Sequence, residues 1–241
     1  MVGAYFTLYV LLFGFVLSEV PDYIHICHKK DPNVVACIKE SIEHLKPKLA
    51  EGLPEIDAPG IDPFLLDKVT IFQGSEKSGL YAYLENLQVR GAGDFEITKL
   101  KLDIDKMTYR VGVTIPFLDI VGAYNINLKI LQNPIKENGD FHANVSGING
   151  QAVIQGELEE NHLMFKSFNF KIGVKDFNVD FGDLFKSNPA LNELAKDLIN
   201  NNKGDLIKMA LPFIERKVAE ILLETSNKIT KNLDYNEVFP E

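Results

Sequence analysis

The sequence predicts an α+β fold in which a strongly curved antiparallel β-sheet wraps a long C-terminal α-helix, forming a super-roll. From about residue 66 to residue 181, apolar and polar side chains alternate, as expected for an antiparallel sheet with one apolar face. Residues 205–229 then place apolar side chains at helical spacing over an unusually broad face. A sheet rolled around this helix would bury both apolar surfaces. Interior volume that the side chains leave unfilled would form a lengthwise hydrophobic tunnel.

The chain begins with a run of uncharged, mainly apolar residues from Ala4 to Leu17, which has the length of a signal-peptide core. We expect residues 1–18 to be a signal peptide and residues 19–241 to form a single lipid-binding domain, secreted into an extracellular fluid such as haemolymph. An uncleaved anchor is the alternative, because no Lys or Arg precedes the apolar run. No later stretch is apolar enough for stable membrane insertion.

Cys27 and Cys37 are the two cysteines of the chain. Cysteines that pass through a secretory route oxidise, so we expect these two to form a disulfide. A metal site is the weaker interpretation. His25 and His28 flank Cys27, but a structural zinc site requires four nitrogen or sulfur ligands and the sequence has no second cluster.

The first helix is predicted over residues 33–51, where apolar side chains recur at spacings of three and four. Asp31 and Pro32 supply a start signal, and Gly52 followed by Pro54 supplies a stop. The proline-rich residues 51–71 should run extended along the surface.

Turn signals divide the predicted sheet at residues 91–93, 105–106, 137–139 and 159–161. Asn138-Gly139 is the most specific of them and predicts a hairpin. After the sheet, residues 188–200 predict a short helix and residues 205–229 the long one.

Inward positions of the strands and of the long helix are the candidate ligand contacts, although side chains at such positions are more often ordinary core. They are Tyr124, Ile126, Leu128, Phe168, Phe170, Leu211, Ile214, Val218 and Leu222. Tyr124 is favoured, because a tyrosine hydroxyl in an apolar wall needs a partner and a ligand oxygen could supply it. The sequon at Asn144 predicts a glycosylation site.

Net charge and motifs narrow the classes of function. A net charge of −9 without a basic cluster argues against nucleic acid and anionic membrane surfaces. The five histidines are scattered, and neither a nucleophile elbow, a zinc-protease helix nor a dinucleotide loop is present. We therefore expect no catalytic residue, no metal and no cofactor. A secreted hydrolase is the weakest alternative, and an extracellular interaction or signalling module with a vestigial cavity is the stronger one.

Several short blocks resemble the takeout and juvenile hormone binding protein family of insects. They are Cys27, Asp31-Pro32-Asn33 and Cys37-Ile38; Gly52-Leu53-Pro54-Glu55-Ile56 and Ile61-Asp62-Pro63; Ile115-Pro116-Phe117, Gly122-Ala123-Tyr124 and Asn138-Gly139; and Val238-Phe239-Pro240. The match extends over the whole chain after the predicted signal peptide, and no single block carries it.

The resemblance implies a helix wrapped in a curved sheet, a lengthwise cavity, the Cys27–Cys37 bridge and secretion. It also implies a monomeric carrier of small apolar ligands, such as terpenoid hormones or fatty acyl or isoprenoid lipids, with links to chemosensation, feeding or circadian physiology. Dedicated hormone carriers of the family have a second disulfide, which two cysteines cannot form. The chain therefore resembles the takeout branch, and juvenile hormone is one candidate ligand among several.

Overall fold

The structure is a computed structural model in which residues 20–56, 58–74, 81–130, 133–185, 189–231 and 233–241 are described. The predicted signal peptide, residues 1–18, lies outside this part. At the β6–β7 connection the described part covers the backbone of residues 128–130 and 133–134 without their side chains.

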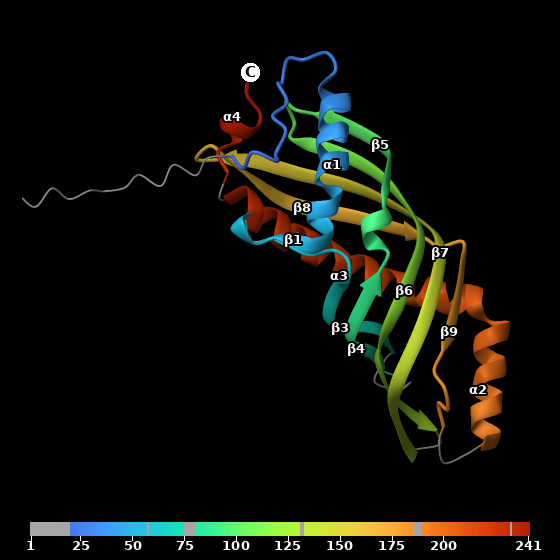
Figure 1. Ribbon diagram of the computed structural model, residues 1–241. Coiled ribbons are helices and arrows are strands. Elements are labelled where there is room, and N and C mark those ends of the chain that lie inside the picture. Colours follow the sequence, from blue (N-terminus) through green and yellow to red (C-terminus); the bar gives the residue numbers. More distant parts are fainter. Residues whose placement is uncertain (1–19, 57, 75–80, 131–132, 186–188, 232) are drawn as a thin grey trace, which may run out of the picture.

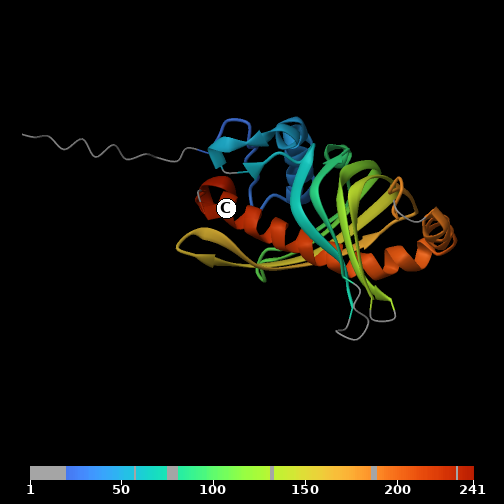
Figure 2. The ribbon, with the colours of Figure 1, turned by 90° about the horizontal axis from the view of Figure 1, so that it is seen from below.

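The main body is a curved, antiparallel seven-stranded sheet. Its strands are β3 (Phe64–Gln73), β4 (Tyr81–Arg90), β5 (Glu96–Asp103), β6 (Thr108–Ile130), β7 (Asn133–Glu159), β8 (His162–Gly173) and β9 (Asp176–Asp180). The spatial order is β3-β4-β6-β7-β8, with β5 beside β6 and β9 beside β7. Figure 2 shows the sheet arching over one long helix, as the alternating pattern and the broad helix face predict.

The helices are α1 (Val34–Glu51), α2 (Pro189–Asn201), α3 (Lys203–Lys231) and α4 (Tyr235–Val238). Short elements follow α1: strands β1 (Gly52–Leu53) and β2 (Ala58–Pro59), and the 3-10 turn η1 (Pro54–Ile56); a second 3-10 turn, η2 (Ala92–Asp94), connects β4 with β5. The predicted helices are confirmed, but α1 begins two residues after Pro32. The Asp31 carboxylate accepts the Asn33 N–H at 2.7 Å, so Asp31 forms a tight turn before the helix instead of capping it.

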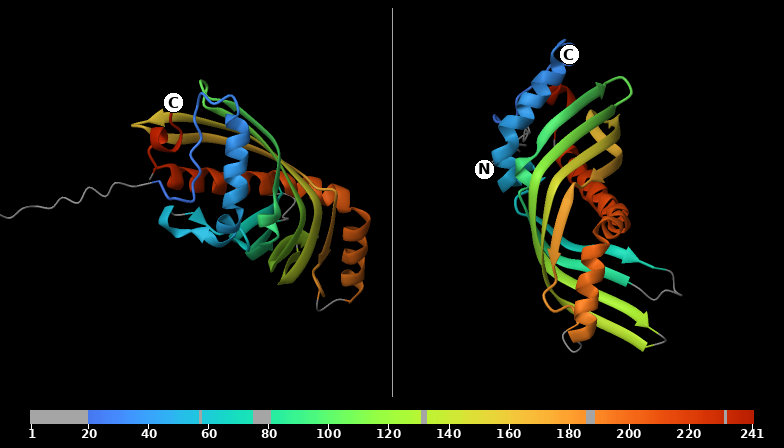
Figure 3. Two further views of the ribbon diagram at one scale, coloured as in Figure 1. Left: turned by 45° about the horizontal axis from the view of Figure 1, so that its top comes forward. Right: turned by 90° about the vertical axis from the view of Figure 1, so that its right-hand side faces the viewer.

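Helix α3 is attached to the free edge of β8 by two side chains. The Asn227 amide accepts the N–H of Phe165 at 2.7 Å and donates to its carbonyl at 2.9 Å. Glu215, nearly buried, accepts the N–H of Ile172 at 2.9 Å and pairs with Lys171 at 2.7 Å. Because α3 also contacts β3, the helix bridges the two outer strands of the open sheet and forms a half-barrel with it (Figures 1 and 3).

The prediction of a hairpin at Asn138-Gly139 is wrong. Both residues lie inside β7, where they pair with Asn125 and Tyr124 of β6. A Cβ atom on Gly139 would lie 2.9 Å from the Tyr124 hydroxyl and 3.0 Å from its ring. The glycine is therefore required because the Tyr124 ring lies across the neighbouring strand, and not because the chain turns there.

The expected disulfide joins Cys27 to Cys37, with its S–S bond at 2.02 Å. The C-terminal tail lies beside this segment (Figure 1). The Lys29 N–H donates to the Pro240 carbonyl at 2.7 Å, and the Lys29 ammonium lies 4.5 Å from the centre of the Tyr235 ring. The two ends of the described chain therefore close the same end of the molecule.

Within the described residues, no helix combines the length and the apolar character needed to cross a membrane.

Candidate functional site

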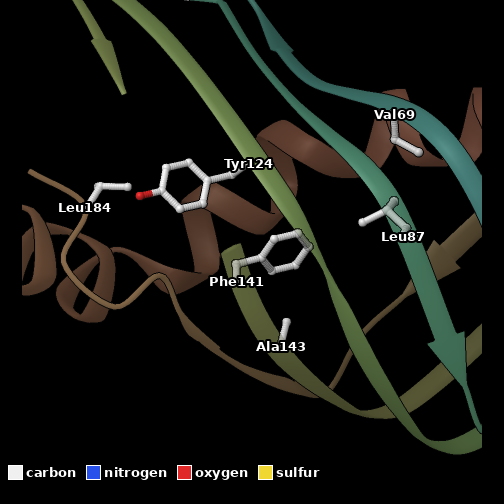
Figure 4. Close-up of a cluster of buried hydrophobic side chains, with 6 residues drawn as sticks. All are labelled: Val69, Leu87, Tyr124, Phe141, Ala143 and Leu184. Atoms are coloured by element: carbon white, nitrogen blue, oxygen red, sulfur yellow. The ribbon is translucent and has the colours of Figure 1, made fainter. Parts of the chain in front are cut away.

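The larger of the two buried apolar clusters in the described residues surrounds Tyr124 (Figure 4), near the end of the half-barrel that carries α2. Its buried members come from β3, β4, β6, β7 and the segment before α2. They are Val69, Leu87, Tyr124, Phe141, Ala143 and Leu184. Ile214 of α3 and Ala195 and Ile199 of α2 pack against the cluster, so it joins the sheet to both helices.

Tyr124 is 1% exposed and is the largest fully buried side chain of the described residues. Its ring meets Phe181 edge-on, with the centroids 5.2 Å apart. The hydroxyl points toward Leu184 (Figure 4), and no described atom forms a hydrogen bond with it. Burial raises the pKa of this phenol, and the carboxylates of Glu137, Asp140 and Asp183 add to the increase.

An unpartnered buried hydroxyl is unfavourable, because it has lost its water and gained no bond. The Tyr124 hydroxyl therefore has an unused donor and an unused acceptor in an apolar surrounding. Such a group can bind one oxygen of an otherwise apolar molecule.

The segment over Tyr124 is held by Asn192 of α2. The side-chain oxygen of Asn192 accepts the Phe185 N–H at 3.4 Å, and the side-chain NH2 of Asn192 donates to the Asp183 carboxylate at 3.0 Å. Asn192 is 6% exposed, which is unusual for a polar helix residue. Leu184 thus covers Tyr124 because α2 fixes the segment on which it lies.

A second apolar surface lies on β6, β7 and β8. Cross-strand pairing forms the rows Tyr109–Ile154–Phe168, Val111–Ala152–Phe170 and Val113–Gly150–Ile172. Within these rows Ala152 and Gly150 are buried, whereas the aromatic and branched side chains are half-buried. Large apolar groups on this surface therefore keep accessible area.

The nine predicted ligand contacts fall into two groups. Tyr124, Ile126 and Ile214 belong to the Tyr124 cluster, whereas Phe168 and Phe170 lie half-buried on β8. Leu211 and Val218 are half-buried on α3, and Leu222 is 37% exposed. The side chain of Leu128 lies outside the described part. Three of the nine therefore belong to one buried cluster, and five others keep accessible area outside it.

Two pockets of about 550 Å³ each open to the surface of the described structure. One lies near Gln88, Val121, His142 and Asp180, over β4, β6, β7 and β9. The other lies between the segment after α1, the start of β3, and Lys217 and Ile221 of α3. Each pocket touches the Tyr124 cluster at one residue, the first at Phe141 and the second at Leu66.

Asn144 is half-buried inside β7, between Asp119 of β6 and Asn178 of β9. Its glycosylation stays a prediction. His25, Cys27 and Cys37 place possible metal-ligand atoms within 4.8 Å of one another, but the disulfide occupies both sulfur atoms. The site therefore lacks the thiolates that a zinc ion would require.

Sequence reasoning missed Glu215, Asn227, Asn192 and Leu184. The first three are polar residues within helices, where the pattern indicates solvent exposure. Leu184 follows the last strand in a segment without periodicity. A buried role for any of them becomes visible once the fold places β8 beside α3 and the segment before α2 over Tyr124.

Comparison with known proteins identifies relatives along almost the entire chain. A sequence model of the family described as "Haemolymph juvenile hormone binding protein (JHBP)" matches residues 6–240. A putative beta-carotene-binding protein of Schistocerca gregaria is 21% identical over 223 residues, which cover 90% of this chain and 88% of the relative. The circadian clock-controlled protein daywake of Drosophila melanogaster is 21% identical over 235 residues, covering 91% and 88% respectively.

A solved structure has the same fold. The crystal structure of Epiphyas postvittana Takeout 1 superimposes with a TM-score of 0.74 at 21% identity. The match covers 90% of this chain and 100% of that protein.

Proposed function

The chain belongs to the haemolymph juvenile hormone binding protein family, and we propose that it is a secreted, non-catalytic carrier of small hydrophobic ligands. The ligand would lie between the apolar face of the sheet and α3. Its chemical class would be terpenoid, fatty acyl or isoprenoid, an apolar body with an oxygen at one end. The relative named for binding beta-carotene supports a terpenoid body, whereas the oxygen is inferred from the Tyr124 hydroxyl alone, because beta-carotene is a hydrocarbon.

One observation carries the proposal: the Tyr124 hydroxyl is buried among apolar side chains without a partner. The half-buried faces of β8 and α3 support it, because a filled core would bury them completely. Tyr124, Ile126, Leu128 and Ile214 would contact one part of the ligand. Phe168, Phe170, Leu211, Val218 and Leu222 would contact the rest.

Secretion is supported by two observations. The matched family is described as a haemolymph family, and disulfides such as Cys27–Cys37 persist in oxidising compartments. A signal peptide over residues 1–18 and a monomeric state belong to the same proposal.

Filling the proposed interior tests this function. Val218→Phe enlarges a half-buried side chain on the helix stripe that includes Ile214, whereas Glu220→Phe adds the same ring at an exposed position two residues away. We expect Val218→Phe to weaken binding of a fluorescent fatty acid at least about tenfold through lost volume, with Glu220→Phe unchanged. Equal affinities of both variants and the parent chain would contradict binding at this surface.

A further inference from the structure

Large apolar side chains remain exposed around the corner between α2 and α3. Leu194 and Leu198, one turn apart on α2, are 54% and 55% exposed. Leu206 and Met209, in the first turns of α3, are 39% and 47% exposed. All four lie within eight residues of Asn202, where the two helices join. We call this region the α2–α3 corner, and Leu194, Leu198 and Leu206 its corner leucines.

The same corner is electrically neutral, although the whole chain carries a net charge of −9. Residues 189–212 contain three acidic and three basic side chains. Lys208 lies 3.5 Å from Asp205, and Lys196 lies 3.8 Å from Glu193, so four of these six charges are paired locally. A neutral apolar surface on an acidic protein suits a partner that carries no net charge.

The exposed area is small. Four half-exposed side chains offer on the order of 200 Å² of apolar surface, compared with about 800 Å² per partner in a stable protein interface. A second copy of the chain or a protein partner would therefore gain little from this corner alone. A lipid surface needs no complementary patch, and a small buried apolar area gives it weak, reversible binding.

The corner also lies directly outside the Tyr124 cluster. An adjacent side of α2 carries Ala195 and Ile199, which pack against the cluster, and Asn192, which holds the segment that covers Tyr124. Helix α2 therefore exposes leucines to solvent on one side and, on another side, holds the segment that covers the Tyr124 hydroxyl.

We propose that the α2–α3 corner docks transiently on the surface of a zwitterionic phospholipid bilayer. The exposed side of α2 would contact the bilayer. The docking itself does not require the proposed carrier function; only its purpose, the exchange of ligand with a membrane, rests on that function. Anionic lipid weakens it, because the net charge of the chain is negative.

Vesicle flotation of the full chain, without added ligand, tests the docking. The probe is phosphatidylcholine vesicles, and a second set contains added phosphatidylglycerol. The variants are Leu194→Glu with Leu198→Glu on α2 and, independently, Met209→Glu on α3. The matched control is Leu158→Glu, because Leu158 is 45% exposed in the β7–β8 hairpin at the opposite end of the molecule (Figure 2).

We expect the parent chain and Leu158→Glu to float with phosphatidylcholine vesicles, and the α2 double variant to partition roughly tenfold less because two apolar contacts become charged. Met209→Glu should also reduce flotation, and phosphatidylglycerol should reduce it for the parent chain. Absence of flotation of the parent chain, an equal loss in Leu158→Glu, or a corner-dependent dimer without vesicle binding would overturn the proposal. Fluorescent fatty acid binding by the same variants, measured without vesicles, reports separately on the carrier function.

Discussion

Tyr124→Phe should stabilise the ligand-free protein while weakening its complex with an oxygen-bearing ligand. The hydroxyl is buried without a partner, and an orphaned buried polar group costs about 1–3 kcal/mol. Removing the oxygen also removes its packing contacts, at about 0.1–0.2 kcal/mol for each atom pair. The free energy of unfolding should therefore increase by about 1 kcal/mol, which corresponds to a Tm increase of about 2–4 °C for a domain of this size.

The complex should change in the opposite direction, because in the parent chain the hydroxyl gains its partner when the ligand binds. We expect affinity for a terpenoid alcohol or epoxide to fall roughly 5- to 30-fold, which is about 1–2 kcal/mol. Affinity for a hydrocarbon of the same length should not change. Urea unfolding of the ligand-free protein and titration with both ligands measure the two effects. A destabilised ligand-free variant, or equal losses for both ligands, would refute the role of this hydroxyl.

Three further predictions follow from the packing. Asn227→Ala removes two hydrogen bonds to Phe165 and should lower the free energy of unfolding by about 1–3 kcal/mol in urea. As a control, Asn169→Ala, at an exposed position on β8, which also carries Phe165, should change the free energy of unfolding by less than about 0.5 kcal/mol. Similar losses in both variants would mean that the Asn227 bonds do not hold α3 to the sheet. Gly139→Ala should destabilise by about 1–3 kcal/mol through contact with Tyr124. Gly204→Ala, with no neighbour within 4 Å of the new Cβ, should be neutral or stabilising by up to about 1 kcal/mol, and a neutral Gly139→Ala would contradict the close packing. Finally, burial and the Glu55 bond raise the pKa of Tyr23 to about 12, and burial also raises the pKa of Tyr109 and Tyr235. Because these phenols lose their protons at a lower pH in the unfolded chain than in the folded one, the free energy of unfolding should fall as pH rises from about 10 toward about 12. A free energy of unfolding that stays constant over that range would contradict these shifts.

Local spacing was sufficient to predict the helices and the sheet. The apolar stripe from Val34 to Leu49 predicts α1, and the broad face from Leu206 to Ile229 predicts α3, because both patterns depend only on helical geometry. Alternation predicts the strands for the same reason. The Cys27–Cys37 disulfide was predictable from the inferred compartment.

Residues whose role depends on distant partners were not predictable in this way. Asn138-Gly139 has the composition of a hairpin turn, but the pair lies inside β7 because Tyr124 of another strand requires a glycine beside it. Asn227 and Glu215 look like solvent-exposed helix residues until β8 is placed alongside α3. The Tyr124 proposal came from chemistry alone, and the structure adds the residues that cover it, Leu184 and Phe181.

The central claim is that the space between the sheet and α3 holds an apolar ligand. Native mass spectrometry of the protein, purified without detergent, tests it most directly. The account predicts a bound hydrophobic molecule that is lost on denaturation and bound less by Val218→Phe than by Glu220→Phe. A ligand-free parent chain that also fails to take up added terpenoid or fatty acyl lipid would contradict it.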